Sequence, residues 1–244
     1  MKIYDCFQFF NEENVLDLRF NILDEFVDFF VIAESTTDHQ GNQKKLNFDI
    51  KKFKKFEKKI IYLVVEDTLD SVKKAHIGQN SLVERHQRNS ILKGLKNCHD
   101  NDLIIISDVD EIPNLKNLDF KKIKGKPVFF NQIFCCYKFN LYSSLRWCGS
   151  RMIKKKKLLS PQWLRDIKDR NYPKWRIDTY FSKKKFNNIK FIEKGGWHFS
   201  YLKEADGVEK KLKSIRHHIE YDQNPIGVKK IEEMIEDKKL IYNY

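Results

Sequence analysis

Three carboxylates follow a run of isoleucines in the segment "IIISDVDEIP", residues 104–113. Asp108 and Asp110 are two residues apart, so their side chains project to one face if the strand continues and can converge on one point if it turns. Carboxylates that lie a few ångströms apart repel each other unless a cation lies between them. The usual cation is Mg²⁺ or Mn²⁺, because both prefer hard oxygen ligands. We predict a divalent-metal site at Asp108 and Asp110; the alternative is a solvated acidic turn that closes a strand.

A histidine near the end of the chain is a candidate third ligand. His198 lies between Trp197 and Phe199 in "GGWHFSYL", residues 195–202, where the two glycines permit close backbone approach. A lone histidine in such an apolar frame is more often a core residue. A nearby metal site makes it a credible ligand as well. Both interpretations of His198 stay open at this point.

An arginine is predicted to face inward from the helix that precedes the acidic segment. The pattern of residues 81–97 predicts this helix, and Ser81 and Glu84 form a capping box at its start. At about 100° per residue, Arg88 falls within the apolar stripe of the helix. A buried guanidinium needs an anionic partner. That partner is Glu84 at i, i+4, a bound phosphate or one of the aspartates.

Alternating strands and helices must position these groups. Continuous apolar strands between helices are typical of a parallel sheet covered on both faces, and ligands bind beyond the carboxyl ends of such strands. Residues 34–39 and 108–111 would both lie at that edge. We therefore predict an α/β fold with a mostly parallel central sheet flanked by helices. The expected strands are residues 2–10, 27–35, 58–67 and 102–110, and a further helix is expected at residues 13–26.

The second half of the chain is less regular and richer in aromatic residues. All four tryptophans follow residue 140, and lysine-rich runs occur at residues 121–126 and 154–157. The spacing from Val208 onward predicts an amphipathic helix with a basic outer face. We expect one domain over residues 1–244. It comprises a nucleotide-binding half, residues 1–113, and an acceptor-binding half with C-terminal helices, residues 114–244.

The overall charge favours anionic partners. Lys and Arg number 47 against 34 Asp and Glu, a formal net charge of +13. The alternative is that evenly spread lysines reflect genome composition alone. The five cysteines are odd in number and two are adjacent, which favours a reducing compartment. No apolar run of about 18 residues occurs, so we expect no membrane span and a cytoplasmic protein.

Three chemistries fit an acidic pair after a strand. The pattern resembles haloacid-dehalogenase-type phosphatases, with Asp108 as nucleophile and Asp110 as acid, but Ile112 departs from their motif. A non-catalytic binder of anionic ligands or nucleic acid would suit the charge. The lysine runs, however, lack a nucleic-acid-binding pattern, so we expect no nucleic acid partner. In sugar transfer from a nucleotide sugar, a metal held by the DxD motif would neutralise the departing diphosphate.

Five segments together resemble glycosyltransferase family 17. They are "KIYDCFQFFNE", "VIAESTTDHQG", "ERHQRN", "DLIIISDVDEIP" and "GGWHFSYL", in this order, and the resemblance runs from residue 2 to about residue 212. The best-known members are β-1,4-mannosyl-glycoprotein 4-β-N-acetylglucosaminyltransferases, which add the bisecting GlcNAc. The resemblance implies a GT-A-like fold, UDP-GlcNAc as donor, Mn²⁺ or Mg²⁺ as cofactor, and inversion at the anomeric carbon.

The resemblance also implies roles for individual residues. Asp108 and Asp110 match the motif for metal and diphosphate, and His198 contacts the metal or the diphosphate. Inversion requires a general base, which the resemblance does not identify, so Glu204, Asp206 and Asp178 are candidates. The residues expected on the donor side are Glu34, Ser35, Arg85, Arg88, Asp108, Glu111 and Trp197.

Two departures from the family bear on location and acceptor. Animal members carry an N-terminal membrane anchor for the Golgi lumen, which is not found here, and this chain is short. We therefore expect action in the cytoplasm or at the inner face of a membrane, on a different glycan acceptor linked to a lipid or a protein. The basic surface and the helix from Val208 would suit peripheral membrane contact.

Overall fold

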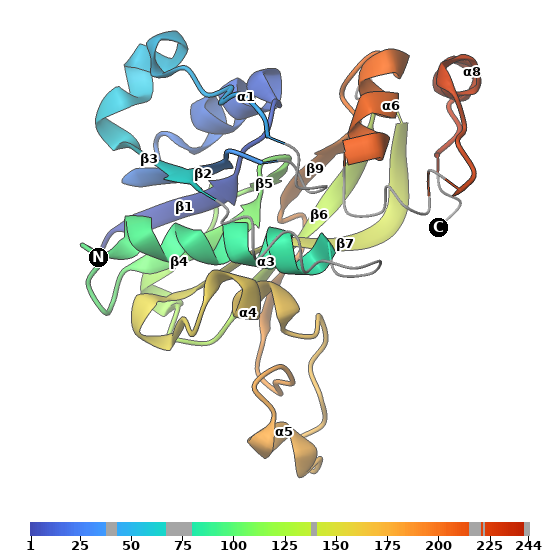
Figure 1. Ribbon diagram of the computed structural model, residues 1–244. Coiled ribbons are helices and arrows are strands. Elements are labelled where there is room, and N and C mark those ends of the chain that lie inside the picture. Colours follow the sequence, from blue (N-terminus) through green and yellow to red (C-terminus); the bar gives the residue numbers. More distant parts are fainter. Residues whose placement is uncertain (38–42, 67–79, 138–140, 215–220, 222, 242–244) are drawn as a thin grey trace.

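The computed structural model describes residues 1–37, 43–66, 80–137, 141–214, 221 and 223–241. Among these residues one large sheet runs through the molecule (Figure 1), in the order β3-β2-β1-β4-β7-β6-β9-β5, with β8 paired to β6. Strands from both predicted halves share this sheet. The strands are β1 Ile3–Gln8, β2 Phe29–Ser35, β3 Ile60–Val65, β4 Leu103–Asp108, β5 Glu111–Pro113, β6 Val128–Cys136, β7 Leu141–Lys154, β8 Lys190–Ile192 and β9 Gly196–Ser200.

The first four strands form a parallel block. β1 pairs in parallel with both β2 and β4, and β2 pairs in parallel with β3. These strands are apolar on both faces because helices cover both sides, so the four strands predicted from the sequence are confirmed. The register places Gln8 opposite Asp108. The carboxyl end of β1 therefore lies beside the acidic segment.

The remaining strands make the sheet mixed. β7 pairs antiparallel with β4 and β6, and β9 pairs parallel with β6 and antiparallel with β5. Five of the eight pairings between the described strands are parallel, so the prediction of an α/β fold with a mostly parallel central sheet is confirmed. The β5–β9 register sets Glu111 opposite His198. Two motifs far apart in the sequence thus meet across one strand pair.

Helices cover the two faces of the sheet (Figure 1). α1 and an unpredicted 3-10 helix, Ile50–Lys59, pack phenylalanines onto one face, and α3 and α4 pack onto the other. The predicted helix at residues 81–97 is α3 followed by a 3-10 turn, Ser90–Leu95; the side chain of its predicted cap, Ser81, is outside the described part. The α-helices are α1 Glu13–Leu23, α3 Asn80–Asn89, α4 Pro161–Asp166, α5 Asp178–Phe181, α6 Ala205–Ser214 and α8 Val228–Glu236.

The C-terminal helices form a small hydrophobic cluster of their own. Val208 and Leu212 of α6 are fully buried and share this cluster with Ile231 of α8. The amphipathic helix predicted from Val208 onward is confirmed as far as Ser214, and residues 215–220 lie outside the described part. The apolar face of α6 is covered by protein. None of the helices in the described part combines the length and apolarity needed to cross a bilayer.

Candidate active site

A buried arginine fixes the backbone of the turn that carries the acidic residues. Nη1 of Arg19, from α1, donates to the carbonyl oxygens of Asp108, Val109 and Glu111 at 3.0, 3.1 and 2.9 Å. The same guanidinium donates to both carboxylate oxygens of Asp5 in β1, at 2.7 and 2.6 Å. Both charged side chains are fully buried, and their pairing compensates both charges. The positions of the acidic side chains therefore depend on the hydrogen bonds that Arg19 makes to the backbone of the turn.

The first aspartate faces two guanidinium groups. Asp108 accepts hydrogen bonds from Arg88 at 2.9 Å and from Arg165 at 3.1 Å, one on each carboxylate oxygen. Arg88 also donates to Glu84 at 2.6 Å, so both predicted protein partners of this arginine are present. Desolvation by the surrounding protein would raise the pKa of Asp108, but Arg165 and Arg88 hold it below its usual value. Asp108 therefore stays ionised, with its side chain 40% exposed.

Glu111 lies deeper and is fully buried. Its carboxylate accepts both terminal nitrogens of Arg165, at 2.7 and 3.0 Å, and Nε1 of Trp147 at 3.0 Å. It also accepts the backbone N–H of Asp108 at 2.9 Å. Burial would lower the pKa of Arg165, but Glu111 and Asp108 raise it above its usual value. Glu111 thus fastens the turn to α4.

A second arginine supports the short helix that supplies Arg165. Nη1 of Arg151, in β7, donates to the carbonyl oxygens of Leu164, Arg165 and Ile167 at the end of α4. The last carbonyl groups of a helix have no partners within the helix, so this guanidinium satisfies groups that burial would otherwise penalise. The sheet thereby fixes α4, and α4 directs Arg165 to Asp108 and Glu111.

The second aspartate faces a lysine and a histidine. Oδ2 of Asp110 lies 3.0 Å from Nζ of Lys211, and Oδ1 lies 3.6 Å from Nε2 of His198. Burial would raise the pKa of Asp110, but Lys211 and His198 lower it well below its usual value. Likewise, burial would lower the pKa of Lys211, and Asp110 raises it. The predicted ligands Asp110 and His198 are therefore brought together, whereas Asp108 is directed to other partners.

The histidine ring is held by stacking. His198 stacks on Trp147, with ring centroids 4.4 Å apart and an interplanar angle of 21°, and Phe134 contacts it edge-on. Within the described part, Nδ1 of His198 is buried without a hydrogen-bond partner. Its ring orientation therefore rests on aromatic packing, and Nε2 is the nitrogen that faces Asp110.

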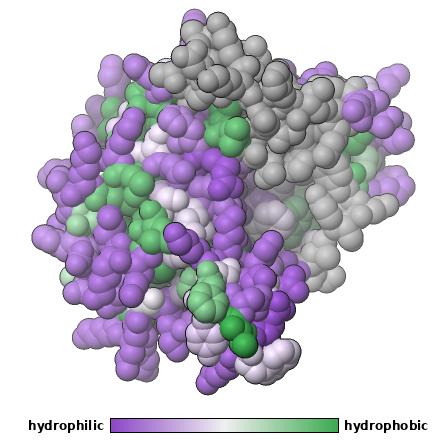
Figure 2. Space-filling model, turned by 60° about the horizontal axis from the view of Figure 1, so that its bottom comes forward, coloured by the Kyte–Doolittle hydropathy of each residue, from purple (hydrophilic) through white to green (hydrophobic). Residues whose placement is uncertain are grey.

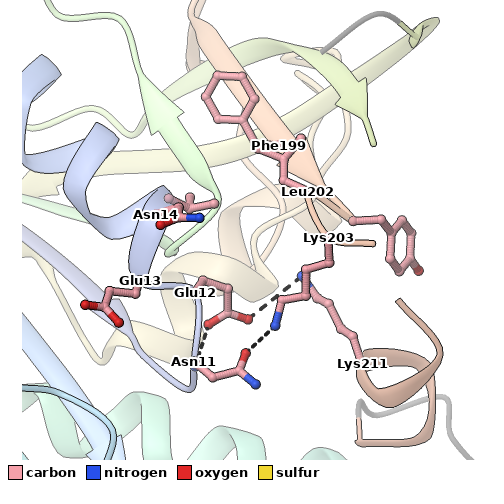
Figure 3. A pocket seen from close by; sticks show the side chains of 10 residues that line it. Asn11, Glu12, Glu13, Asn14, Phe199, Leu202, Lys203 and Lys211 are labelled. Atoms are coloured by element: carbon pink, nitrogen blue, oxygen red, sulfur yellow. Dashed lines mark hydrogen bonds and ion pairs between the residues drawn. The ribbon is translucent and has the colours of Figure 1, made fainter. Parts of the chain in front are cut away.

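A polar cleft of about 90 Å³ is lined in part by Lys211 (Figure 3), the lysine that contacts Asp110. Nζ of Lys211 lies 4.0 Å from Glu12, and Lys203 contacts Asn11 at 2.6 Å across the cleft. The segment that follows β1 forms one wall, so the cleft lies past the carboxyl end of a parallel strand, where ligands bind in such sheets. Its lining residues are Asn11, Glu12, Glu13, Asn14, Val15, Phe199, Tyr201, Leu202, Lys203 and Lys211.

Glu34, predicted on the donor side, is fully buried and engaged by its own neighbourhood. Its carboxylate accepts Lys44 and the N–H of Asn47 at 2.7 Å, Tyr62 at 2.9 Å and the N–H of Phe48 at 3.0 Å. These contacts hold the segment after β2. Among the described residues, no hydrogen bond or ion pair joins Glu34 to the acidic turn.

The other predicted donor-side residues contact different partners. Oγ of Ser35 is 3.2 Å from Oγ1 of Thr37. Arg85 donates to both carboxylate oxygens of Asp166, at 3.3 and 2.8 Å, so it braces α4. Trp197 packs against the hydrophobic cluster on the α1 face, because neighbouring residues of a strand point to opposite faces and His198 takes the other.

The candidate bases do not share one location. Glu204 and Asp206 are exposed at the start of α6, and Asp206 lies 3.6 Å from Lys210. Asp178 is in α5, at the far end of an arm that projects from the body (Figure 1), and contacts Arg176 and Lys185 at 2.8 and 2.6 Å. Glu204 and Asp206 therefore lie close in sequence to Lys211, whereas Asp178 lies on the arm.

Five contributors were missed in the sequence: Arg19, Arg151, Arg165, Trp147 and Lys211. Lys211 carried a weak signal, because it precedes the buried Leu212 in a predicted amphipathic helix. Nothing in "SPQWLRD" marks Arg165, which reaches Glu111 across 54 residues of sequence. Trp147 required knowledge of how β7 pairs within the sheet.

Comparison with known proteins gives a family. No curated protein matches this chain. A crystal structure of HddC from Yersinia pseudotuberculosis has a TM-score of 0.37 and 11% identity, covering 80% of this chain and 92% of that one. The same protein complexed with GMP-PN has a TM-score of 0.36 and 11% identity, covering 79% of this chain and 90% of that one. An active-site mutant of LgtC has a TM-score of 0.32 and 10% identity, covering 64% of this chain and 58% of that one. The sequence model of glycosyltransferase family 17, by contrast, matches residues 1–242. This chain belongs to glycosyltransferase family 17.

Proposed function

We propose that this glycosyltransferase has a GT-A-like fold and moves GlcNAc from UDP-GlcNAc onto a glycan acceptor, with inversion and with a divalent cation. The observation that carries the proposal is the pair Asp110 and His198, which face each other at 3.6 Å beside Lys211 and the cleft. The motifs that resemble family 17 support UDP-GlcNAc as the donor. Family membership favours sugar transfer over the phosphatase and the non-catalytic binder.

The residues present suit a magnesium or manganese ion completed by substrate. No cluster of three or more His, Cys, Asp or Glu side chains is arranged for a metal in the described part of the chain. Mg²⁺ is commonly held by one or two carboxylates together with waters and substrate phosphates. Asp110 and His198 would hold the ion, and Asp108, whose two carboxylate oxygens are held by Arg88 and Arg165, would stay beside it. The bound ion would offset negative charge on the leaving diphosphate.

The chain itself supplies cations for the same purpose. Arg88, Arg165 and Lys211 all contact the aspartates of the turn, so they lie where a diphosphate would be attracted. As the bond between the anomeric carbon and the phosphate oxygen breaks, its electron pair stays on UDP. Preorganised cations stabilise this developing charge without reorganisation. Asp108, 40% exposed at the turn, is suited to accept a donor hydroxyl.

A carboxylate must remove the proton from the attacking acceptor hydroxyl. The hydroxyl oxygen bonds to the anomeric carbon on the face opposite the leaving UDP, which inverts the configuration. We propose Glu204 or Asp206 for this role, because Glu204 directly precedes α6 and Asp206 lies in its first turn, and α6 brings Lys211 to Asp110. Glu204→Gln and Asp206→Asn separate the two: the true base loses transfer to the acceptor but retains donor binding.

The proposed setting is the cytoplasm, with an acceptor glycan linked to a lipid or a protein. All five cysteines are free, including the adjacent Cys135 and Cys136, which suits a reducing compartment. The net charge of +13 suits an anionic carrier or surface.

Release of UDP tests the proposal without knowledge of the acceptor. The protein is incubated with UDP-GlcNAc and Mn²⁺, with and without EDTA, and UDP is measured. Slow UDP release that EDTA abolishes supports the proposal, and UDP-glucose and UDP-galactose test the choice of sugar. Hydrolysis of a phosphomonoester without UDP release would support the phosphatase, and stabilisation by nucleic acid but not by UDP would support the binder.

A further inference from the structure

We propose that the arm formed by residues 168–190 docks this protein on an anionic lipid bilayer, with its apolar tip inserted among the headgroups. This inference does not depend on the proposed function. The arm projects from the body and ends at α5 (Figure 1). Trp175, Ile177, Tyr180 and Phe181 are 78, 73, 69 and 85% exposed. Single exposed apolar residues are ordinary, but four large ones within seven positions form a patch that indicates an interaction site.

Polar contacts inside the arm keep these side chains outward. Arg176 donates to Asp178 at 2.8 Å, and Thr179 donates to the carbonyl of Arg176 at 2.7 Å. Farther back, Asn171 exchanges hydrogen bonds with the backbone of Ile189 at 2.9 and 2.6 Å. These hydrogen bonds and ion pairs hold the backbone of the arm. None of the four apolar side chains belongs to a hydrophobic cluster of the described residues.

The charge of the arm selects an anionic partner. Eight Lys and Arg stand against two Asp in residues 168–190. Lys174 borders Trp175, and Lys183 and Lys184 follow Phe181; all three are exposed. Figure 2, in which the bottom of the molecule is turned forward, shows green apolar surface bordered by purple hydrophilic surface. Each Lys or Arg near a bilayer with anionic lipid adds attraction, which falls off within about a Debye length, ~10 Å.

The combination of side chains matches the headgroup region of a bilayer. Trp175 and Tyr180 each carry a polar atom on an apolar ring, and such rings prefer the boundary between water and hydrocarbon. Lysines extend their charged ends away from buried methylene groups. Ile177 and Phe181 are purely apolar, which suits acyl chains and offers nothing to a nucleic acid phosphate. The apolar face of α6, the other candidate for membrane contact, is buried against α8.

The arm is also mechanically joined to the body. Nε1 of Trp163, in α4, donates to the carbonyl of Lys183 at 2.6 Å, and Lys184 lies 3.1 Å from Asp166. α4 in turn carries Arg165. A bilayer that held the tip would therefore hold the acidic turn at a set distance from its surface.

Vesicle flotation of the full chain tests the proposal. Vesicles contain phosphatidylcholine alone or equal parts phosphatidylcholine and phosphatidylglycerol, and binding to the anionic set only is expected. The double variant Trp175→Ala with Phe181→Ala should bind at least about tenfold more weakly, because it removes two aromatic anchors. Lys174→Glu with Lys183→Glu should weaken binding at least about tenfold as well. These side chains are exposed, so unfolding transitions should match those of the wild type.

Two matched controls separate the effect of the arm from that of exposed apolar groups and of positive charge elsewhere on the protein. Tyr142→Ala with Leu46→Ala removes exposed apolar groups elsewhere, and Lys54→Glu with Lys58→Glu reverses charge on the 3-10 helix Ile50–Lys59. Binding of the first control should be unchanged. Binding of the second should fall less than that of the arm variant.

Insertion has its own readout. Anionic vesicles should shift the tryptophan emission of the wild type to shorter wavelength, and the shift should vanish in Trp175→Phe, which keeps the other three tryptophans. Any of three results would overturn the proposal. The first is no binding to anionic vesicles, and the second is binding that the Trp175→Ala and Phe181→Ala changes leave intact. The third is that these changes abolish self-association of the protein but leave vesicle binding unchanged.

Discussion

The two sides of the acidic turn are built differently. On the arginine side, Asp108 and Glu111 meet the planar guanidinium groups of Arg88 and Arg165 in several short hydrogen bonds. On the lysine–histidine side, Asp110 has a 3.0 Å contact with Lys211 and a longer 3.6 Å approach to His198. Guanidinium–carboxylate forks are directional and rigid, whereas a lysine is a flexible point charge that can move aside.

This difference suits the two sides to different roles: one holds the turn in place, and the other can exchange its partner for a ligand. Both carboxylate oxygens of the buried Glu111 are occupied, so the arginine side holds the turn in place. Lys211 neutralises Asp110 from a separate helical cluster at the C-terminal end. In the proposed mechanism, an incoming ion and diphosphate would take the place of Lys211 on Asp110, and the forks would stay intact. We therefore expect substitutions on the two sides to differ in kind: loss of activity on one, loss of stability on the other.

The largest expected effect is that of Asp110→Asn. Removing the carboxylate that would hold the ion should lower UDP release at least about 1,000-fold, since a Lewis acid supplies several kcal/mol and each 1.36 kcal/mol is tenfold. Calorimetry should show that Mn²⁺ binding is lost. The matched control Asp17→Asn, on the exposed face of α1, should behave as wild type. Full activity in Asp110→Asn would contradict the assignment of the two sides.

Glu111→Gln should act chiefly on stability. The amide leaves Arg165 with reduced compensation in a buried site, and breaking a buried ion pair costs about 3 kcal/mol. Urea unfolding should show this loss, while the exposed control Glu57→Gln should change stability by less than about 0.5 kcal/mol. If Glu111→Gln unfolds at the same urea concentration as wild type, the arginine side is not what holds the turn.

Asp108→Asn should have the smallest effect on metal binding. Its side chain is 40% exposed and shares Arg165 with Glu111, so the expected loss of stability is about 1 kcal/mol. The Mn²⁺ concentration for half-maximal UDP release should stay within about threefold of wild type, because the remaining ligands are Asp110 and His198. A shift as large as that of Asp110→Asn would make Asp108 an equal metal ligand and remove the distinction between the two sides.

Local pattern was enough for part of the fold and part of the site. The four parallel strands, α1 and the inward-facing Arg88 follow from hydrophobic periodicity, which operates over a few residues. The sequence offered Glu84, a bound phosphate or one of the aspartates as the partner of Arg88, and Arg88 contacts both Glu84 and Asp108. The meeting of His198 with the acidic turn was expected from the motifs, and the β5–β9 pairing explains it.

The missed features all depend on distant pairing or local competition. Arg165 and Trp147 reach Glu111 only after β7 and α4 have packed on the sheet, and no periodicity encodes that. The resemblance implied Trp197 on the donor side with His198, but alternation along β9 sends the two side chains to opposite faces. Glu34 lies at a strand end like the acidic turn, but its carboxylate oxygens accept hydrogen bonds from the N–H groups of Asn47 and Phe48 and from the hydroxyl of Tyr62.

A crystal of this protein grown with Mn²⁺ and UDP would test the central claim most directly, through the anomalous signal of manganese. The account predicts an ion within bonding distance of Asp110 and Nε2 of His198, with Lys211 displaced and Arg165 still on Glu111. An ion held by Asp108 in place of Arg88 and Arg165, with Lys211 still on Asp110, would contradict it.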